Sequence, residues 1–297
     1  MKFELAGNFP ALITPITKDL EIDYQSLRDF VDFQIENGVD GLLPCGTTGE
    51  SATMSHEEHR KVIKTVVDQA NGRVQVLAGT GSNSTSEAIS LTKYAEDAGA
   101  DAAMLICPYY NKPTQRGLIN HFKMVAEATN LPVVLYNVPS RTGRNIEAQT
   151  TIELSKVPNI IGIKEASGNL GQIMEIIRKT GDDFNVISGD DSLTYAIYCL
   201  GGTGIISVAT NVVPRMMSDY VGKLKEGKFL EAREYHYKLY DLFKTLFIET
   251  NPAPAKEVAK IYKIAGIENW FLRPPLITTT EDTSNKLKAV IDALNVY

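Results

Sequence analysis

The chain contains 297 residues, of which 43% are hydrophobic and 22% are charged, as in an ordinary globular protein with a large core. Its net charge of −6 and the lack of any Lys/Arg-rich stretch argue against a nucleic-acid binder. No apolar run is long enough to span a membrane, and the N-terminal sequence does not resemble a signal peptide. We therefore expect a cytoplasmic protein.

Eight short apolar runs predict strands. Most of them are continuous rather than alternating, which is typical of strands covered on both faces. The runs lie at residues 10–13, 41–45, 74–78, 102–107, 133–138, 160–163, 186–188 and 204–208.

Amphipathic helical patterns separate these runs. The first shows apolar residues on one face and ends before Gly38, and the second begins at a cap-like Ser55. Such patterns occupy residues 24–37, 55–70, 86–98, 114–128 and 170–179. The alternation predicts a (β/α)8 TIM barrel, and a doubly wound sheet is the alternative with the same alternation.

The segment after the eighth strand has a helical pattern. Further helices are expected at residues 228–248, 255–265 and 283–294, with Pro252 and Pro254 as breaks. We expect a catalytic barrel at residues 1–225 and additional C-terminal helices at residues 226–297, packed on the barrel as a layer.

The three cysteines are Cys45, Cys107 and Cys199, and none forms a C-x-x-C pair. Each lies in or beside an apolar segment. This placement predicts buried free thiols in a reducing compartment.

Lys164 lies within the apolar run that we expect to form the sixth strand. A lysine held neutral by burial is a nucleophile that can form a Schiff base with a carbonyl substrate. Two structural alternatives are an ion pair with Glu165 and a strand end that leaves the ammonium in solvent. In a barrel, chemistry takes place at the carboxyl ends of the strands, which is where this lysine would lie.

Glycine-rich turns follow the second and third strands. The turn GTTGES at residues 46–51 exposes backbone N–H groups beside Thr47 and Thr48, so it could bind an anion or simply cap a helix. The turn GTGSNS at residues 79–84 lacks the third glycine of a dinucleotide fingerprint.

The ends of the fourth and fifth strands carry aromatic and basic residues. Tyr109 and Tyr110 could serve only packing, whereas Tyr136 could transfer protons if its phenol lies near an amine. Arg141 could hold a carboxylate in a bidentate fork or be a solvated loop charge.

His56 and His59 are three residues apart, whereas a H-E-x-x-H zinc site would place them four apart. No third ligand is evident, so a metal site is not expected. The pair could bind a small polar ligand or lie on a solvated helix face.

Four motifs occur in the order expected of one enzyme family. They are GTTGE at 46–50, PYYN at 108–111, YNVPSRTG at 136–143 and GIKEA at 162–166. Together they resemble the dihydrodipicolinate synthase family of class I pyruvate-dependent lyases, which also includes N-acetylneuraminate lyase. The resemblance covers nearly the whole chain. It implies condensation of pyruvate with L-aspartate-4-semialdehyde in lysine (diaminopimelate) biosynthesis, without any metal or organic cofactor.

The resemblance also implies a set of catalytic residues. Lys164 would form the Schiff base with pyruvate, and Tyr136 would move protons beside it. Thr47 would connect Tyr136 to Tyr110, which a neighbouring subunit would supply.

Substrate binding is implied at further positions. The backbone at Thr47 and Thr48 would hold the pyruvate carboxylate, and Arg141 would guide the carboxylate of the semialdehyde. Gly189 and Ile206 would line the site through their main chain.

The same resemblance implies regulation and assembly. Members of this type can bind L-lysine as an inhibitor and are commonly homotetramers built from two tight dimers. The matching lysine-binding positions are Ser51, Ala52, His56, His59, Asn83, Glu87 and Tyr109.

Two other functions are alternatives to the one that the resemblance implies. A related aldolase, acting on N-acetylneuraminate or a 2-keto-3-deoxy sugar acid, usually has Ser in place of Thr47 and lacks a match for Arg141. A barrel that only binds or regulates would not need Lys164, Tyr136, Thr47 and Tyr110 together.

Overall fold

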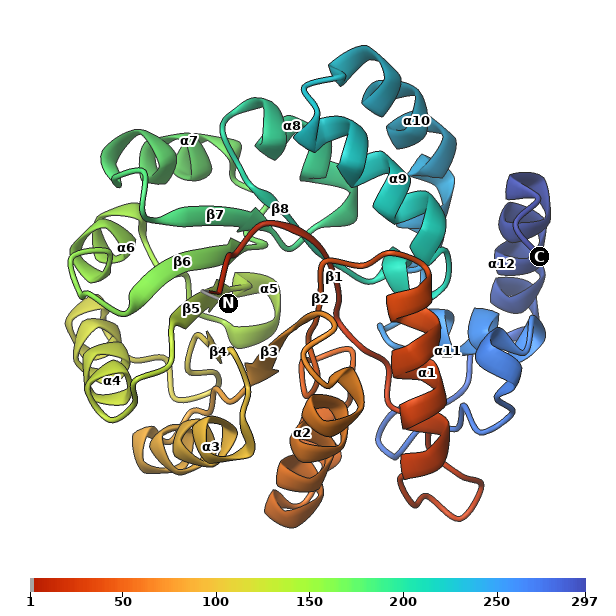
Figure 1. Cartoon of the computed structure of the whole chain (residues 1–297), viewed down its shortest axis with the longest axis horizontal. Coiled ribbons are helices and arrows are strands. Elements are labelled where there is room, and N and C mark those ends of the chain that lie inside the picture. The colour runs from red at the N-terminus through yellow and green to blue at the C-terminus, as the bar shows by residue number, and fades with distance from the viewer. Residues whose placement is uncertain (1–2) are drawn as a thin grey trace. The chain divides into compact units, whose positions relative to one another are not determined.

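The computed structural model describes residues 3–297, and its elements are labelled in Figure 1. The strands are β1 (Gly7–Pro10), β2 (Gly41–Leu42), β3 (Gln75–Gly79), β4 (Ala102–Ile106), β5 (Val133–Asn137), β6 (Ile160–Glu165), β7 (Asn185–Ser188) and β8 (Gly204–Ser207).

Helices connect the strands and form the C-terminal part of the chain. The α-helices are α1 (Tyr24–Glu36), α2 (His56–Ala70), α3 (Thr85–Ala98), α4 (Gln115–Glu127), α5 (Pro139–Thr142), α6 (Ala148–Leu154), α7 (Leu170–Lys179), α8 (Thr194–Cys199), α9 (Pro214–Lys225), α10 (Phe229–Thr245), α11 (Ala253–Ile261) and α12 (Glu281–Leu294). Short 3₁₀ helices are η1 (Ser51–Thr53), η2 (Asp191–Leu193), η3 (Ala209–Asn211) and η4 (Ile264–Gly266).

The sheet has the sequential strand order of a (β/α)8 barrel. Its eight strands are arranged β1-β8-β7-β6-β5-β4-β3-β2, and a parallel bridge between Ala11 and Leu43 joins the segments that follow β1 and β2. A doubly wound sheet would instead reverse its strand order at a switch point. The predicted TIM barrel with additional C-terminal helices is therefore confirmed.

The chain forms two compact units, which we describe separately. The first unit contains Gln75–Ile206 together with residues 3–6, and the second contains Gly7–Val74 and Ser207–Tyr297. The boundary expected at residues 225 and 226 separates barrel from C-terminal helices, and it stays a prediction.

The first unit is a run of parallel strands covered by helices. Tyr136 on β5 pairs with Lys164 on β6, which pairs in turn with Ile187 on β7. Helices α3, α4, α6 and α7 lie outside these strands (Figure 1). β4, β5 and β6 are buried along nearly their whole length, and their sequences are mostly apolar until the polar residues that end β5 and β6.

The second unit contains β1, β2 and the C-terminal helices α9 to α12. Helix α1 packs against α2, and α12 packs against α10 and α11. The rings of Phe30 and Trp270 meet edge to face at 5.2 Å, which joins α1 to the segment after α11. Ser55 and Glu58 form a capping box that begins α2, as the cap-like Ser55 predicted.

Several predicted boundaries differ from the structure. The first strand was predicted at residues 10–13 but ends at Pro10, although Leu12 and Ile13 are buried. The second ends at Leu42 rather than at Cys45, whose φ of 57° is incompatible with a strand. Burial therefore extends beyond the strands, and apolar runs overestimate their length.

Two further expectations were wrong. Helix α10 ends before the expected breaks at Pro252 and Pro254, but the next helix begins at Ala253 rather than at residue 255, so Pro254 lies in its first turn, where a missing N–H costs nothing. Cys45 and Cys107 are buried free thiols, as predicted, but Cys199 is exposed because α8 directs Thr194 and Ile197 inward instead.

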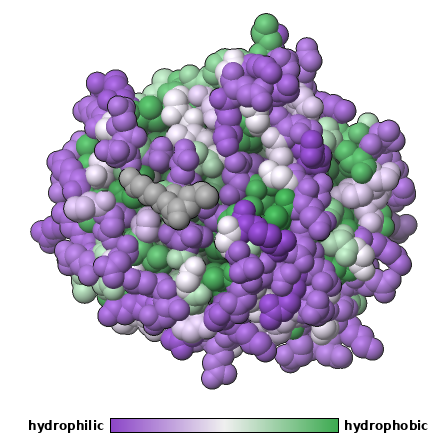
Figure 2. Space-filling model, in the orientation of Figure 1, coloured by the Kyte–Doolittle hydropathy of each residue, from purple (hydrophilic) through white to green (hydrophobic). Residues whose placement is uncertain are grey.

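The face drawn in Figure 2 is mostly hydrophilic, with small hydrophobic patches between hydrophilic side chains. Within residues 3–297, no helix is both long enough and apolar enough to cross a membrane. The same residues contain no group of three or more His, Cys, Asp and Glu side chains suited to hold a metal ion.

Candidate active site

Lys164 is a buried amine at the end of β6. Its exposed fraction is 5%. Burial lowers the pKa of Lys164 to about 7; the negative charge of Asp191 opposes this shift, and the positive charge of Arg141 adds to it. A considerable share of the amine is therefore unprotonated near neutral pH, which is the state that attacks a carbonyl.

Tyr136 lies directly beside this amine. The two residues are register partners on adjacent parallel strands, and Lys164 Nζ lies 4.3 Å from the centroid of the Tyr136 ring. Tyr136 is itself buried. A phenol held this close to a reactive amine is suitably placed to exchange protons with groups bound there.

Glu165 faces away from Lys164, as expected from the alternation of side chains along a strand. Its carboxylate accepts hydrogen bonds from Asn137 Nδ2 at 3.1 Å, Ser167 N at 2.8 Å and Gln172 Nε2 at 3.0 Å. Burial raises the pKa of Glu165, and these hydrogen bonds oppose the shift. The Glu165 carboxylate therefore links the ends of β5 and β6 to α7, on the side of the sheet away from the Lys164 amine.

Gly189 provides room for the lysine chain. A Cβ added at this position would lie 2.9 Å from Lys164 Cε and 2.9 Å from Ala166 Cβ. Its backbone N–H donates to Glu165 O at 2.9 Å, which fixes it next to β6. Ile206, the other main-chain position predicted to line the site, is buried within β8.

Asp191 is a residue of this site that the sequence did not reveal. It begins η2 after β7, is buried, and is close enough to raise the pKa of Lys164. Its position after an apolar strand was a signal that could have identified it. Asp190 directly before it caps the same 3₁₀ helix by accepting from Ser192 N at 2.9 Å.

Three further residues of the predicted sites, Arg141, Tyr110 and Tyr109, are more exposed than Lys164. Arg141 is exposed on the single turn of α5, and its positive charge reaches Lys164. Tyr110 is 89% exposed and has a φ of 71°, so its ring projects away from the chain that carries it. Tyr109 is exposed to a smaller extent, at 38%.

Thr47 and Thr48 belong to the second unit, in the turn after β2. Thr48 Oγ1 accepts from Asn251 Nδ2 at 2.9 Å, and Gly49 O accepts from Thr14 Oγ1 at 2.8 Å. Thr48 is buried and Thr47 partly buried. The turn is therefore held by contacts on both sides, while its role beside Lys164 stays a prediction.

The positions predicted to bind L-lysine are divided between the two units. Ser51, Ala52, His56 and His59 lie in the second unit, where His56 is exposed and His59 is buried.

Asn83, Glu87 and Tyr109 lie in the first unit. The Asn83 carbonyl accepts from Asn111 Nδ2 at 2.9 Å, and the Glu87 carboxylate accepts from the Ser82 hydroxyl. These bonds order the turn after β3 and its junction with α3.

Comparison with known proteins identifies the family. The model of the Dihydrodipicolinate synthetase family matches residues 4–294. The 4-hydroxy-tetrahydrodipicolinate synthase of Syntrophotalea carbinolica is 50% identical over 285 residues, covering 96% of each chain.

Two crystal structures with bound small molecules have the same fold. The chloride-inhibited dihydrodipicolinate synthase of Acinetobacter baumannii, complexed with pyruvate, is 40% identical with a TM-score of 0.95, covering 99% of this chain and 100% of that one. The Cyanidioschyzon merolae enzyme with lysine bound is 38% identical with a TM-score of 0.93, covering 98% and 99%. The chain therefore belongs to the Dihydrodipicolinate synthetase family, and it is an enzyme of the lyase and synthase type.

Proposed function

We propose that this enzyme condenses pyruvate with L-aspartate-4-semialdehyde through a Schiff base on Lys164, in lysine (diaminopimelate) biosynthesis. The observation that carries the proposal is the buried Lys164 amine, with its pKa near 7, placed over the ring of Tyr136. The pyruvate bound to the A. baumannii relative supports the choice of the first substrate.

The first half of the reaction makes a carbon nucleophile. The free amine of Lys164 attacks the ketone carbon of pyruvate, and loss of water gives an iminium. This cation withdraws electrons, so a proton leaves the pyruvate methyl group and an enamine forms.

The second half forms the new bond. The enamine carbon attacks the aldehyde carbon of the semialdehyde, whose oxygen takes up a proton, and the iminium on Lys164 is regenerated. The substrate amino group then attacks the iminium carbon, closes the ring and releases the lysine amine. No oxidation or reduction occurs.

Proton transfers accompany most of these steps. Tyr136 would donate and accept protons beside the amine, and Thr47 would relay them to Tyr110 of a neighbouring subunit. The exposure of Tyr110 supports a role outside its own chain.

Carboxylate recognition would require separate groups for the two substrates. Backbone N–H groups at Thr47 and Thr48 would receive the pyruvate carboxylate, and Arg141 the carboxylate of the semialdehyde. Gly189 and Ile206 would line the site through their main chain.

Borohydride trapping tests the proposal. Reduction in the presence of pyruvate should add one pyruvate-derived group, and peptide mass mapping should place it on Lys164 and not on Lys256, the second buried lysine. Lys164→Ala should abolish the adduct. An unmodified Lys164 would rule out the Schiff-base mechanism.

The second substrate is tested by adding aldehydes to the pyruvate-loaded enzyme. Turnover with aspartate semialdehyde, and none with N-acetylmannosamine or short sugar aldehydes, supports the synthase over the related aldolases. Arg141→Ala should weaken semialdehyde use far more than pyruvate use. Equal losses for both substrates would contradict the role of Arg141.

L-lysine would inhibit the enzyme at the positions predicted from the resemblance. The lysine-bound C. merolae relative supports this, and the Glu87 carboxylate would face the lysine ammonium. Glu87→Gln should therefore weaken inhibition, whereas Glu57→Gln, an exposed change in the first turn of α2, should not. Full activity of the natural enzyme at millimolar lysine would disprove the inhibition.

The enzyme would work as a homotetramer of two tight dimers in the cytoplasm. The exposed Tyr110 is consistent with a partner subunit, and the free thiols Cys45 and Cys107 suit a reducing compartment.

A further inference from the structure

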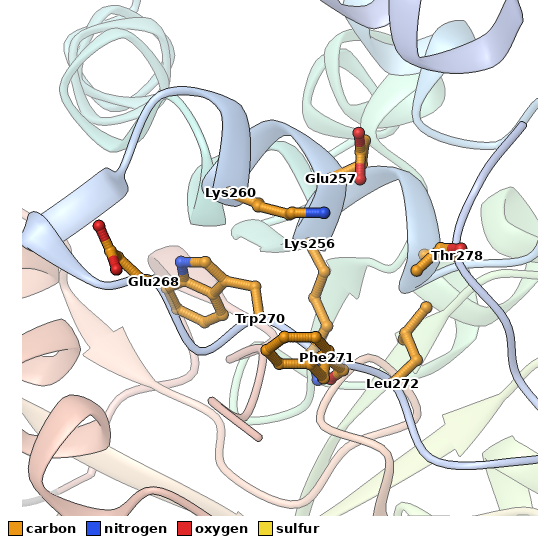
Figure 3. Close-up of a pocket in the computed structure, with 9 residues that line it drawn as sticks. Lys256, Glu257, Lys260, Glu268, Trp270, Phe271, Leu272 and Thr278 are labelled. Atoms are coloured by element: carbon orange, nitrogen blue, oxygen red, sulfur yellow. The ribbon is translucent and has the colours of Figure 1, made fainter. Parts of the chain in front are cut away.

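Lys256 on α11 is a second buried lysine, and no sequence pattern indicated its burial. Only 1% of its surface is exposed. Figure 3 shows its side chain running from α11 toward the segment of Phe271 and Leu272. Its ammonium donates to Glu50 Oε1 and, at 2.7 Å, to Phe271 O.

The surroundings of Lys256 show that it is not a second nucleophile. Burial lowers the pKa of Lys256 to about 8, but Glu50 opposes the shift and keeps the amine charged. The cavity beside it has a volume of about 10 Å³, which holds no more than about one water. A pyruvate molecule does not fit, so the ion pair has another purpose.

Glu50 connects this pair to the turn that carries Thr47 and Thr48. Its backbone is in the left-handed region with a φ of 60°, and its carboxylate is buried inside the second unit. Oε1 accepts from Lys256, and Oε2 accepts from the backbone N–H of Arg273 at 3.1 Å. Both oxygens are thus used to hold the turn against the C-terminal segment.

Other contacts fix the same turn less strongly. Asn251 donates to Thr48 Oγ1, and Thr14 donates to Gly49 O, but both are bonds between neutral groups. A hydrogen bond between charged groups is about twice as strong as one between neutral groups. Since a left-handed non-glycine residue is costly, Glu50 needs such a restraint to keep its conformation.

We propose that Lys256 and Glu50 are positioning residues for pyruvate, whose ion pair holds the 46–51 turn ready to receive the substrate carboxylate. The inference rests on the proposed role of Thr47 and Thr48 in binding that carboxylate. Backbone N–H groups bind an anion well only when they are already aligned, because ordering them on binding costs affinity.

Two variants test the pair. Lys256→Met leaves the Glu50 carboxylate buried without its cation, which could prevent folding. The double variant Lys256→Met/Glu50→Gln removes both charges at similar volume and preserves an oxygen for the Arg273 N–H. Lys263→Met serves as the matched control, because it breaks an exposed ion pair with Glu268 in the same unit.

Two measurements are needed. Amide hydrogen exchange of residues 47–51 reports the turn without any substrate, and the pyruvate concentration that half-saturates borohydride trapping reports binding. In the double variant we expect both exchange and half-saturation to rise about tenfold or more, with the trapping rate at saturating pyruvate nearly unchanged. The control should match the natural enzyme in both.

The outcomes separate this proposal from the function on which it rests. Wild-type exchange and half-saturation in the double variant would overturn the positioning role, as would a double variant that fails to fold. An equal loss of trapping rate and affinity would also overturn it. If the natural enzyme forms no pyruvate adduct, the proposed function fails instead, whatever the exchange data show.

Discussion

The two buried lysines show how the surroundings of a side chain decide its chemistry. Lys164 and Lys256 both have pKa values lowered by burial, to about 7 and about 8. Lys256 is ion-paired with Glu50, and the cavity of about 10 Å³ beside it is too small for a substrate. Lys164 instead lies over an aromatic ring, with Gly189 leaving room above its chain. Burial makes both amines unusual, but only Lys164 has the surroundings of a nucleophile.

The charges around Lys164 predict opposite effects of two substitutions on its pH profile. Asp191 raises the pKa of Lys164 and Arg141 lowers it. Asp191→Asn should therefore shift the midpoint of borohydride trapping with pyruvate to lower pH, and Arg141→Gln should shift it to higher pH. Each shift should be about one pH unit. The measurement is the trapping rate against pH.

A control for these variants is Glu175→Gln. It breaks the exposed ion pair with Lys179 on α7 and should leave the midpoint unchanged. Shifts of both active-site variants in the same direction would show that the substitutions disturb the packing of Lys164 rather than its electrostatics.

Gly189 predicts a steric effect on catalysis. In Gly189→Ala the new methyl would lie 2.9 Å from Lys164 Cε and would force the lysine chain to move. We expect the rate of pyruvate adduct formation to fall about 100-fold, with a loss of stability of about 1–3 kcal/mol. Trapping kinetics and thermal unfolding measure the two effects.

Gly181→Ala is the matched control, because a Cβ there would meet nothing within 4 Å. It should trap pyruvate at the natural rate. A Gly189→Ala enzyme as fast as this control would mean that Lys164 has more freedom than its packing indicates.

At the level of elements, helix α2 is stabilised by a charge from the far end of the sequence. Arg273 donates to both carboxylate oxygens of Glu58, at 2.9 and 2.5 Å, and lowers the pKa of Glu58 to about 2. Glu58 also closes the capping box of α2 with Ser55. The carboxylate therefore supports the helix only while it is ionised.

The ion pair between Glu58 and Arg273 should affect the stability of the protein in acid. A carboxyl group whose pKa is lower in the folded state contributes stability above its ordinary pKa of about 4.5, and this is lost as the pH falls toward 2. Arg273→Gln should raise the Glu58 pKa and move acid unfolding to higher pH. Circular dichroism of α-helix against pH measures the midpoint.

Arg215→Gln controls for loss of a positive charge, since its pair with Asp219 is largely exposed. It should leave the acid midpoint almost unchanged. An Arg273→Gln variant with the natural midpoint would show that Glu58 contributes little to the stability of α2.

Sequence patterns predicted the elements well where periodicity and burial coincide. Helix α7 begins and ends at the predicted residues, because its apolar stripe extends over the same residues as the helix. The second strand was predicted too long, because residues 43–45 remain buried after the backbone has turned. Burial is a property of the fold, while strand length depends on hydrogen bonds that apolar runs do not show.

Sequence patterns could not reveal the partner of Lys256. This lysine lies in an amphipathic helix, where a charged residue is expected on the solvent side, and Glu50 is 206 residues away. Only the fold shows that this side of α11 faces inward. Lys164 was easier to recognise because a lysine in a β-strand core breaks the local pattern.

At the scale of the whole molecule, the sequential strand order explains how distant motifs contribute to one chemistry. Because β5, β6 and β7 are neighbours, Tyr136, Lys164 and Gly189 come from three different βα units but meet at the carboxyl ends of their strands. The alternation of elements and the family motifs predicted this arrangement. Subunit assembly has no comparable pattern, since exposed aromatic residues such as Tyr110 and Tyr237 also occur on monomers.

If Tyr110 acts in the site of a partner subunit, two inactive variants should restore each other. Lys164→Ala lacks the nucleophile, and Tyr110→Phe lacks the relay hydroxyl. A mixed dimer contains one site with Lys164 from one chain and Tyr110 from the other. Mixing the variants under conditions that exchange subunits should therefore return activity to about a quarter of all sites.

A control mixture distinguishes a relay through the Tyr110 of a partner subunit from a relay within one chain. Mixing Lys164→Ala with Lys164→Ala/Tyr110→Phe cannot build a site with Lys164 and so sets the background of the assay. If Tyr110 served its own chain, every mixed dimer would lack either the nucleophile or the relay in each site. The mixture would then stay as inactive as its parts, and the 89% exposure of Tyr110 would need another explanation.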